Sequence, residues 1–70
     1  MNISANKFVW VHDETLIGYA DQLGMAKRKM PKSFVVDGMG EFKLDGKEGS
    51  DKKTHYYLYW NNNILIKIAV

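Results

Sequence analysis

Residues 54–70, THYYLYWNNNILIKIAV, consist of two runs of β-prone residues separated by three asparagines. Aromatic residues dominate the first run and branched aliphatic residues the second, and both types favour strands. Asparagine tolerates the left-handed backbone region, so residues 61–63 predict a tight turn. The stretch therefore predicts a β-hairpin, which must supply most of the core in a chain of 70 residues.

Alternation along residues 54–60 divides their side chains between two faces of the predicted strand. One face is assigned to the core, and it carries Tyr56, Leu58 and Trp60. The opposite face carries polar tips that suit solvent, those of His55, Tyr57 and Tyr59. The sequence thus predicts Tyr57 and Tyr59 on the outer side of the sheet, as an exposed pair that binds a partner. The alternative is that both cover half-buried sheet surface or lie beneath the helix.

The last run, residues 64–70, has one charge and no proline. Such a strand would be a template for aggregation if it lay at an open edge. We therefore expect it inside the sheet, with residues 7–12 as its second neighbour. The alternative is that it pairs with a second copy of the chain, in a homodimer through the C-terminal strand.

Residues 7–12, KFVWVH, are apolar on both faces and predict a covered strand. Asp13 can then act as an N-cap, with Gly24 at the position of a helix-ending glycine. Between them, the residues that recur at helical spacing are Leu16, Ile17, Ala20 and Leu23. This pattern predicts a short helix.

The alternative makes residues 15–20 a second strand, in a hairpin with the first. Gly18 favours it, because a glycine inside a helix costs about 1 kcal/mol relative to alanine. Asp13 and Glu14 argue against it, since they are not a typical hairpin-turn pair. The helix is the preferred interpretation.

A second hairpin is predicted around Asp37 and Gly38, with residues 34–36 and 42–44 as its strands. Residues 45–53 contain two glycines and no large apolar residue, which predicts an exposed, mobile loop. The expected fold is one α+β domain over residues 1–70, with one short helix on a face of an antiparallel sheet of about five strands, in the order β-α-β-β-β-β. A small SH3-like β-barrel of five strands is the alternative if residues 15–20 are extended. The residues expected to pack together are Leu16, Ala20 and Leu23 against Phe8, Trp10, Phe34, Tyr56, Leu58, Ile66 and Ile68.

Composition excludes several classes of protein. The absence of cysteine excludes disulfides and thiolate chemistry. No apolar run reaches the roughly 20 residues that span a bilayer, and the first residues lack a signal-peptide pattern. We expect a soluble, cytoplasmic protein that does not bind membranes.

Residues able to support catalysis are few and scattered: His12, Asp13, Glu14 and His55. Nothing in the sequence brings the two histidines together, and a metal site needs three or four ligands. The glycines in residues 38–40 precede a predicted strand, whereas a phosphate loop precedes a helix. The sequence therefore predicts no enzyme, no cofactor and no metal.

Four cations stand within six residues, with no acid between them: Lys27, Arg28, Lys29 and Lys32. Such a cluster either keeps a loop solvated or faces an anion. Ala20, Gly24 and Met25 also match the spacing of a helix-turn-helix, with the second hairpin as a wing. However, Pro31 leaves too little room for a recognition helix, so this motif would be a degenerate one.

A small chain with no catalytic constellation predicts a binding module that docks on a larger protein, as an inhibitor or adaptor of the kind that mobile elements encode. The alternative is an accessory nucleic-acid-binding regulator that uses the basic cluster and stacked tyrosines. A net charge of +2 and a single arginine favour the protein partner. The candidate binding residues are Lys27, Arg28, Lys29, Lys32, His55, Tyr57 and Tyr59.

Overall fold

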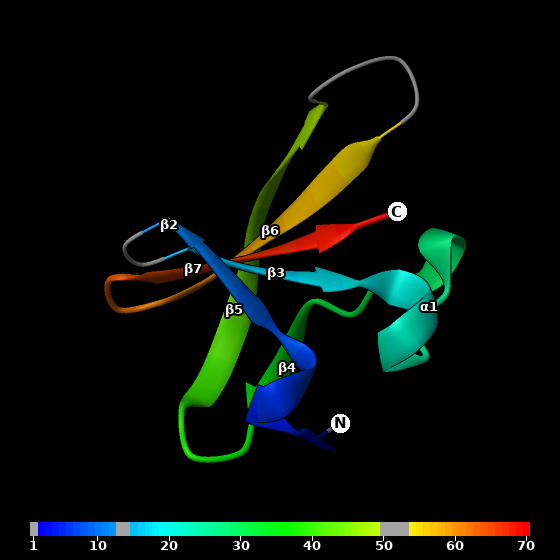
Figure 1. Ribbon diagram of the computed structural model, residues 1–70. Coiled ribbons are helices and arrows are strands. Elements are labelled where there is room, and N and C mark those ends of the chain that lie inside the picture. Colours follow the sequence, from blue (N-terminus) through cyan, green and yellow to red (C-terminus); the bar gives the residue numbers. More distant parts are fainter. Residues whose placement is uncertain (1, 13–14, 50–53) are drawn as a thin grey trace.

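The structure, a computed structural model, describes residues 2–12, 15–49 and 54–70. Seven strands form one mixed sheet in the order β1-β4-β5-β6-β7-β3-β2, and the sheet curls into a half-barrel (Figure 1). The strands are β1 (Asn2–Ile3), β2 (Val9–His12), β3 (Thr15–Tyr19), β4 (Ser33–Val36), β5 (Gly40–Gly49), β6 (His55–Asn61) and β7 (Ile64–Ala69). The helical segments are α1 (Ala20–Leu23) and two 3-10 turns, η1 (Ala5–Lys7) and η2 (Lys27–Lys29).

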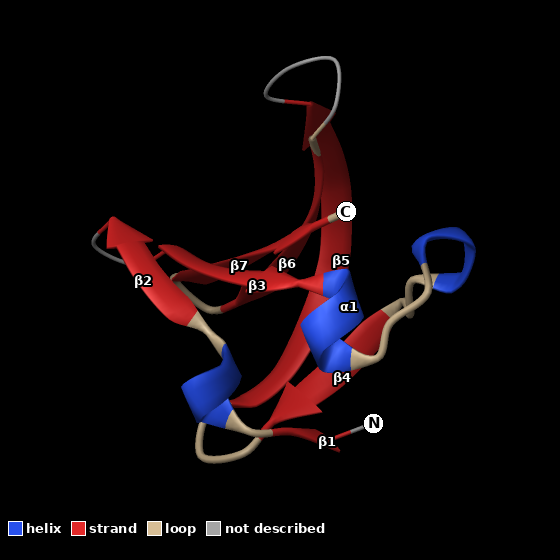
Figure 2. Cartoon of the chain, turned by 45° about the vertical axis from the view of Figure 1, so that its right-hand side comes forward, coloured by secondary structure: helices blue, strands red, loops and turns tan. Residues whose placement is uncertain are grey.

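The expected sheet of about five antiparallel strands is wrong. Two of the pairings, β1 with β4 and β3 with β7, are parallel, and the sheet has seven strands rather than the five of either predicted fold. The helix does not cover a face of the sheet, because α1 has only four residues and lies at the end of β3 (Figure 2). Curling of the sheet instead lets its inner face enclose the core.

The C-terminal hairpin is confirmed. β6 and β7 are antiparallel, with Asn61 opposite Ile64, so the turn contains Asn62 and Asn63 and is one residue shorter than expected. Asn62 has a φ of 55°, the left-handed conformation that asparagine tolerates. β7 lies between β6 and β3, which confirms its interior position, but its second neighbour is β3 rather than residues 7–12.

The helix predicted from Asp13 to Leu23 is wrong over most of its length. Residues 15–19 form β3, which pairs antiparallel with β2, as in the alternative interpretation. Helix α1 begins only at Ala20, and Gly24 ends it with a φ of 73°, as predicted. The strand is favoured over the helix because its pairing with β7 places Leu16 opposite Ile66 and Gly18 opposite Ile68. Leu16 and Gly18 therefore lie on the inner face of the sheet.

The second hairpin is confirmed, with Val36 opposite Gly40 and a three-residue turn between them. Gly38 and Gly40 have φ values of 84° and 95°, which favour glycine. The exposed loop predicted over residues 45–53 is wrong for residues 45–49, because β5 continues to Gly49 through an irregularity between Leu44 and Gly46. Residues 50–53 lie outside the described residues.

The core occupies the concave side of the half-barrel. Its largest fully buried side chains are Val36, Phe34, Phe42, Tyr59, Ile66 and Ile68. The ring of Phe34 lies 6.0 Å from that of Phe42 and meets the edge of Tyr59 at 4.6 Å between centroids. Leu16, Ala20 and Phe8 are buried as predicted, whereas Trp10 is 55% exposed.

Candidate docking surface

The two faces of β6 are reversed relative to the prediction. Tyr59 lies opposite the buried Ile66 and Tyr57 opposite the buried Ile68, so both tyrosines point to the inner face. Tyr59 has no exposed area, and Tyr57 packs against the core. The predicted exposed Tyr57/Tyr59 pair is therefore wrong, because Tyr59 is buried and Tyr57 is half-buried.

Tyr59 is buried because its polar end has a partner. Its hydroxyl donates a hydrogen bond of 2.7 Å to the carbonyl oxygen of Pro31, which satisfies a group that would be costly to bury alone. Burial raises the pKa of Tyr59 to about 12, and the nearby Tyr57 adds to the rise. Tyr59, which was predicted to bind a partner, thus connects the core to the segment that carries the four cations, residues 27–32, here called the basic segment.

The outer face of the sheet carries the remaining aromatic residues. Because inner and outer positions alternate, Trp60 and its neighbour Leu65 on β7 face outward, as do Leu58 and Tyr56. On β3, Ile17 and Tyr19 face outward, and Val9 continues the row on β2. We call this set the outer patch: Val9, Ile17, Tyr19, Tyr56, Leu58, Trp60 and Leu65.

Little of the protein covers the outer patch. Within the described part of the chain, β6 makes its main contacts with the neighbouring strands β5 and β7, and β7 with β6 and β3. Tyr19 is 53% exposed and Trp60 39% exposed. Tyr19 also borders a hollow of about 210 Å³ beside Ala69 and Val70. A solvated sheet face is normally polar, so an apolar one marks an interaction surface.

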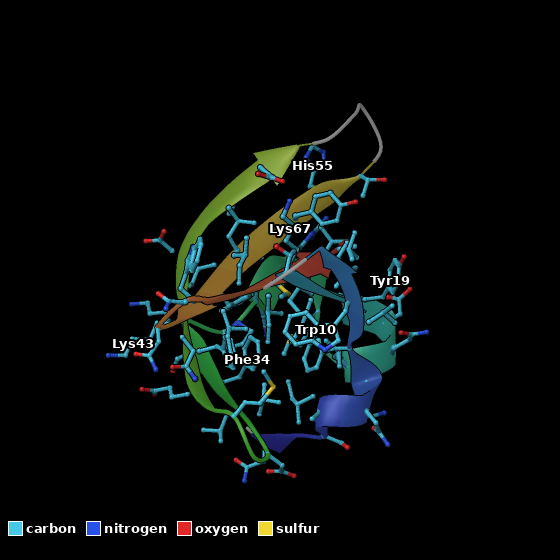
Figure 3. All side chains as sticks on the ribbon, turned by 60° about the vertical axis from the view of Figure 1, so that its left-hand side comes forward. Trp10, Tyr19, Phe34, Lys43, His55 and Lys67 are labelled. Atoms are coloured by element: carbon cyan, nitrogen blue, oxygen red, sulfur yellow. The ribbon has the colours of Figure 1, made fainter. Side chains whose placement is uncertain are left out.

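One ion pair crosses the outer face. The Nζ atom of Lys67 lies 2.7 Å from Oε1 of Glu48 and 5.6 Å from the centre of the Tyr56 ring. Figure 3 shows Lys67 on β7. Further charged residues lie along β5, where Lys43 is opposite Trp60. The outer patch is therefore apolar apart from Lys67, which lies between Leu58 and Ile17, and further charged residues lie beside it on β5.

The basic segment lies at a different place. It comprises the 3-10 turn η2 and the residues that follow it up to Lys32. Two hydrogen bonds hold its C-terminal end: the Tyr59 hydroxyl donates to the Pro31 carbonyl, and the Leu44 amide donates to the Lys32 carbonyl at 2.8 Å. The exposed side chains of Arg28, Lys29 and Lys32 make no ion pair with any carboxylate that the structure describes. The backbone of Lys27 belongs to the same turn.

The predicted helix-turn-helix is absent from the described residues. The segment after Gly24 forms a three-residue 3-10 turn before Pro31, and the preceding α1 has only four residues. Two helices of this length cannot cross and present side chains along a groove. The spacing of Ala20, Gly24 and Met25 therefore reflects a helix end, with Ala20 and Met25 buried in the core.

The residues considered for catalysis are not gathered into a site by the described part of the structure. His55 is exposed at the start of β6, and His12 is the last residue of β2. Asp13 and Glu14 lie outside the described residues. Over residues 2–12, 15–49 and 54–70, no group of three or more histidine or acidic side chains could hold a metal ion, and no helix is long and apolar enough to cross a membrane.

Comparison of the chain with protein-family models, with curated proteins and with solved structures gave no match. The surface itself therefore provides the evidence for a function. The aromatic residues of 54–60 indicated the correct strand. However, Tyr56, Leu58 and Trp60, which were predicted to lie in the core, face outward. The contributions of Val9, Ile17 and Tyr19 depend on the pairing of β3 with β7 and of β2 with β3. Local patterns did not indicate the parallel pairing of β3 with β7.

Proposed function

We propose that the chain is a non-enzymatic binding module that docks on a larger protein through the outer patch, as an inhibitor or adaptor. The observation that supports this most directly is the exposure of Tyr19 and Trp60 on a sheet face that also carries Ile17, Leu58 and Leu65. Tyrosine and tryptophan contribute disproportionately to protein interfaces, because they bury a large area with few rotatable bonds.

The distribution of charge also suits a protein partner. The Lys67–Glu48 pair crosses the outer face, and Lys43 lies opposite Trp60 at its margin. Lys67 lies between Leu58 and Ile17, so one charge stands within the outer patch, and its ion pair with Glu48 lets a partner cover it without leaving an unpaired charge. A partner with a matching apolar centre would bury Trp60 and Tyr19 while the charges stay partly hydrated.

The test is affinity capture followed by binding with purified components. The wild-type chain is used to capture proteins from its source cells, and each recovered protein is then titrated by calorimetry with the wild type, Trp60→Ala and Tyr19→Ala. We expect each substitution to weaken binding at least tenfold, corresponding to about 1.4 kcal/mol.

The matched control is Lys29→Ala, which changes an exposed side chain of the basic segment and leaves the outer patch intact. Circular dichroism must show the same unfolding temperature for all variants within a few degrees. Binding that is unaffected by Trp60→Ala and Tyr19→Ala but lost in Lys29→Ala would contradict docking through the outer patch.

A second candidate function is nucleic-acid binding through the basic segment. Its support is that Arg28, Lys29 and Lys32 are exposed and make no ion pair with the described carboxylates. Fluorescence polarisation with random single- and double-stranded oligonucleotides, at low and moderate salt, tests it directly. Binding that falls steeply with salt and disappears on neutralising the basic segment would support this function; absence of binding at low salt would exclude it.

A further inference from the structure

Strand β2 leaves three consecutive apolar side chains exposed. Val9 is 65% exposed, Trp10 55% and Val11 47%. Because successive side chains of a strand point to opposite faces, exposure of all three means that neither face of β2 is covered. Trp10 lies opposite the buried Leu16, on the inner face, and is still half exposed.

β2 is also the last strand of the sheet. Among the described strands it pairs with β3 alone, so alternate backbone N–H and C=O groups point away from the sheet. Figures 1 and 2 show it at the rim of the half-barrel. The opposite edge, β1, has two residues and offers far less backbone for pairing.

This edge lacks two of the usual protections, lysine and proline. Proteins protect an edge strand with lysine, proline, a bulge or a short length. The sequence FVWV from Phe8 to Val11 contains no charge and no proline. β2 has only four residues, and its register with β3 is irregular between Trp10 and His12, which limits the backbone available for pairing. Val9 and Trp10 are nevertheless regularly paired with β3.

We propose that β2 pairs with β2 of a second copy of the chain, antiparallel about a two-fold axis, and that the two half-barrels form one continuous sheet. An antiparallel edge is self-complementary, since the same groups face each other on both sides of the axis. The uncharged segment from Phe8 to Val11 brings no like charges together. This inference goes beyond the proposed function and does not depend on it.

The exposed area limits how much apolar surface this dimer can bury. About half of a tryptophan side chain and half of two valines amount to roughly 300 Å² of apolar surface per copy. A specific, stable interface buries about 600 Å² or more per partner. We therefore expect a weak, reversible dimer with a dissociation constant of roughly 10 µM to 1 mM, rather than a permanent one.

Sedimentation equilibrium on the full chain measures this association. From about 10 µM to 1 mM the weight-average mass should rise from 8.1 kDa towards twice that value. The double variant Val9→Lys with Val11→Lys should weaken the dimer at least about tenfold, because it places like charges across the paired edge.

Tyr19→Lys is the matched control. Tyr19 is exposed to a similar extent, but its strand β3 has a neighbour on both sides, so this variant should dimerise like the wild type. Equal unfolding temperatures by circular dichroism establish that the variants are folded. A second readout does not depend on the lysine variants: Trp60→Phe leaves Trp10 as the only tryptophan, and its emission should shift to shorter wavelength as the mass rises.

A mass of 8.1 kDa over the whole range would overturn the proposal and would leave the edge free for a strand of another protein. Dimerisation that is unaffected by the paired lysines, or weakened equally by Tyr19→Lys, would also overturn it. The same holds if the emission of Trp10 does not change while the mass increases.

Discussion

The inner and outer faces of β6 carry similar side chains, but the fold uses them differently. On the inner face, Tyr59 is fully buried, donates a hydrogen bond to Pro31 and contacts Phe34. On the outer face, Trp60 is larger and more apolar, yet it remains 39% exposed. Hydrophobicity alone therefore does not decide which face is buried, because closure of the half-barrel and a partner for the hydroxyl group outweigh it.

The largest expected contrast is in stability. Tyr59→Ala should lower the free energy of unfolding by about 3–5 kcal/mol, because it leaves a cavity beside Phe34 and an unpaired carbonyl at Pro31. Trp60→Ala should cost roughly 1 kcal/mol, since it removes a half-exposed side chain whose cross-strand neighbours are Leu65 and Lys43. Urea unfolding of both variants measures the difference. Equal losses would mean that the outer face is as closely packed as the inner one.

The second contrast is in pH dependence. Because the pKa of Tyr59 is about 12 in the folded chain and 10.0 in its ordinary state, the unfolded chain releases this proton first. Its contribution to stability is therefore complete below pH 10 and is lost as the pH rises from 10 to about 12. The expected loss is at most roughly 3 kcal/mol.

Tyr59→Phe is the matched variant, since it keeps the ring and removes the hydroxyl group that titrates. The stability of this variant should be lower than that of the wild type at pH 8, by about 1 kcal/mol for the missing hydrogen bond. The difference should shrink above pH 10 in denaturant unfolding experiments. If both proteins lose stability in parallel, the alkaline transition belongs to other groups.

Features that depend on residues close in sequence could be predicted, whereas features that depend on distant residues could not. Both hairpins were predicted, because Asp37, Gly38 and the asparagines specify turns through their own backbone preferences. The inner face of β6 was not predicted correctly, since aromatic residues occupy both sets of alternating positions. The burial of Tyr59 depends on Pro31, which is distant in sequence.

Strand β3 illustrates the same limit. Its residues match helical spacing, and Gly18 was the only local sign of a strand. The structure explains this glycine through Phe8, whose ring fills the space where a side chain would lie. Nor could the outer patch be assembled from the sequence, because it requires the parallel pairing of β3 with β7.

A third prediction tests that explanation of Gly18. A Cβ atom at this position would lie 2.9 Å from the Phe8 ring and 3.0 Å from Leu23. Gly18→Ala should therefore destabilise the fold by about 1–3 kcal/mol, although alanine restricts the unfolded chain more than glycine does. Thermal unfolding measures the loss.

The control for Gly18→Ala is Gly46→Ala, because a Cβ at Gly46 would meet nothing within 4 Å. Gly46→Ala should leave the unfolding temperature nearly unchanged. If Gly18→Ala proves as stable as Gly46→Ala, then Phe8 moves away freely and the ring does not determine the choice of glycine.

The smallest expected effect concerns the ion pair on the outer face. Lys67 and Glu48 keep 25% and 45% of their side chains exposed, so water weakens their attraction. A double-mutant cycle with Lys67→Met and Glu48→Gln should give a coupling energy of about 0.2–1 kcal/mol, decreasing at 1 M salt. A coupling above about 2 kcal/mol that does not respond to salt would mean that the pair is shielded from water. The outer face would then be covered in solution, and the contrast with the inner face of β6 would disappear.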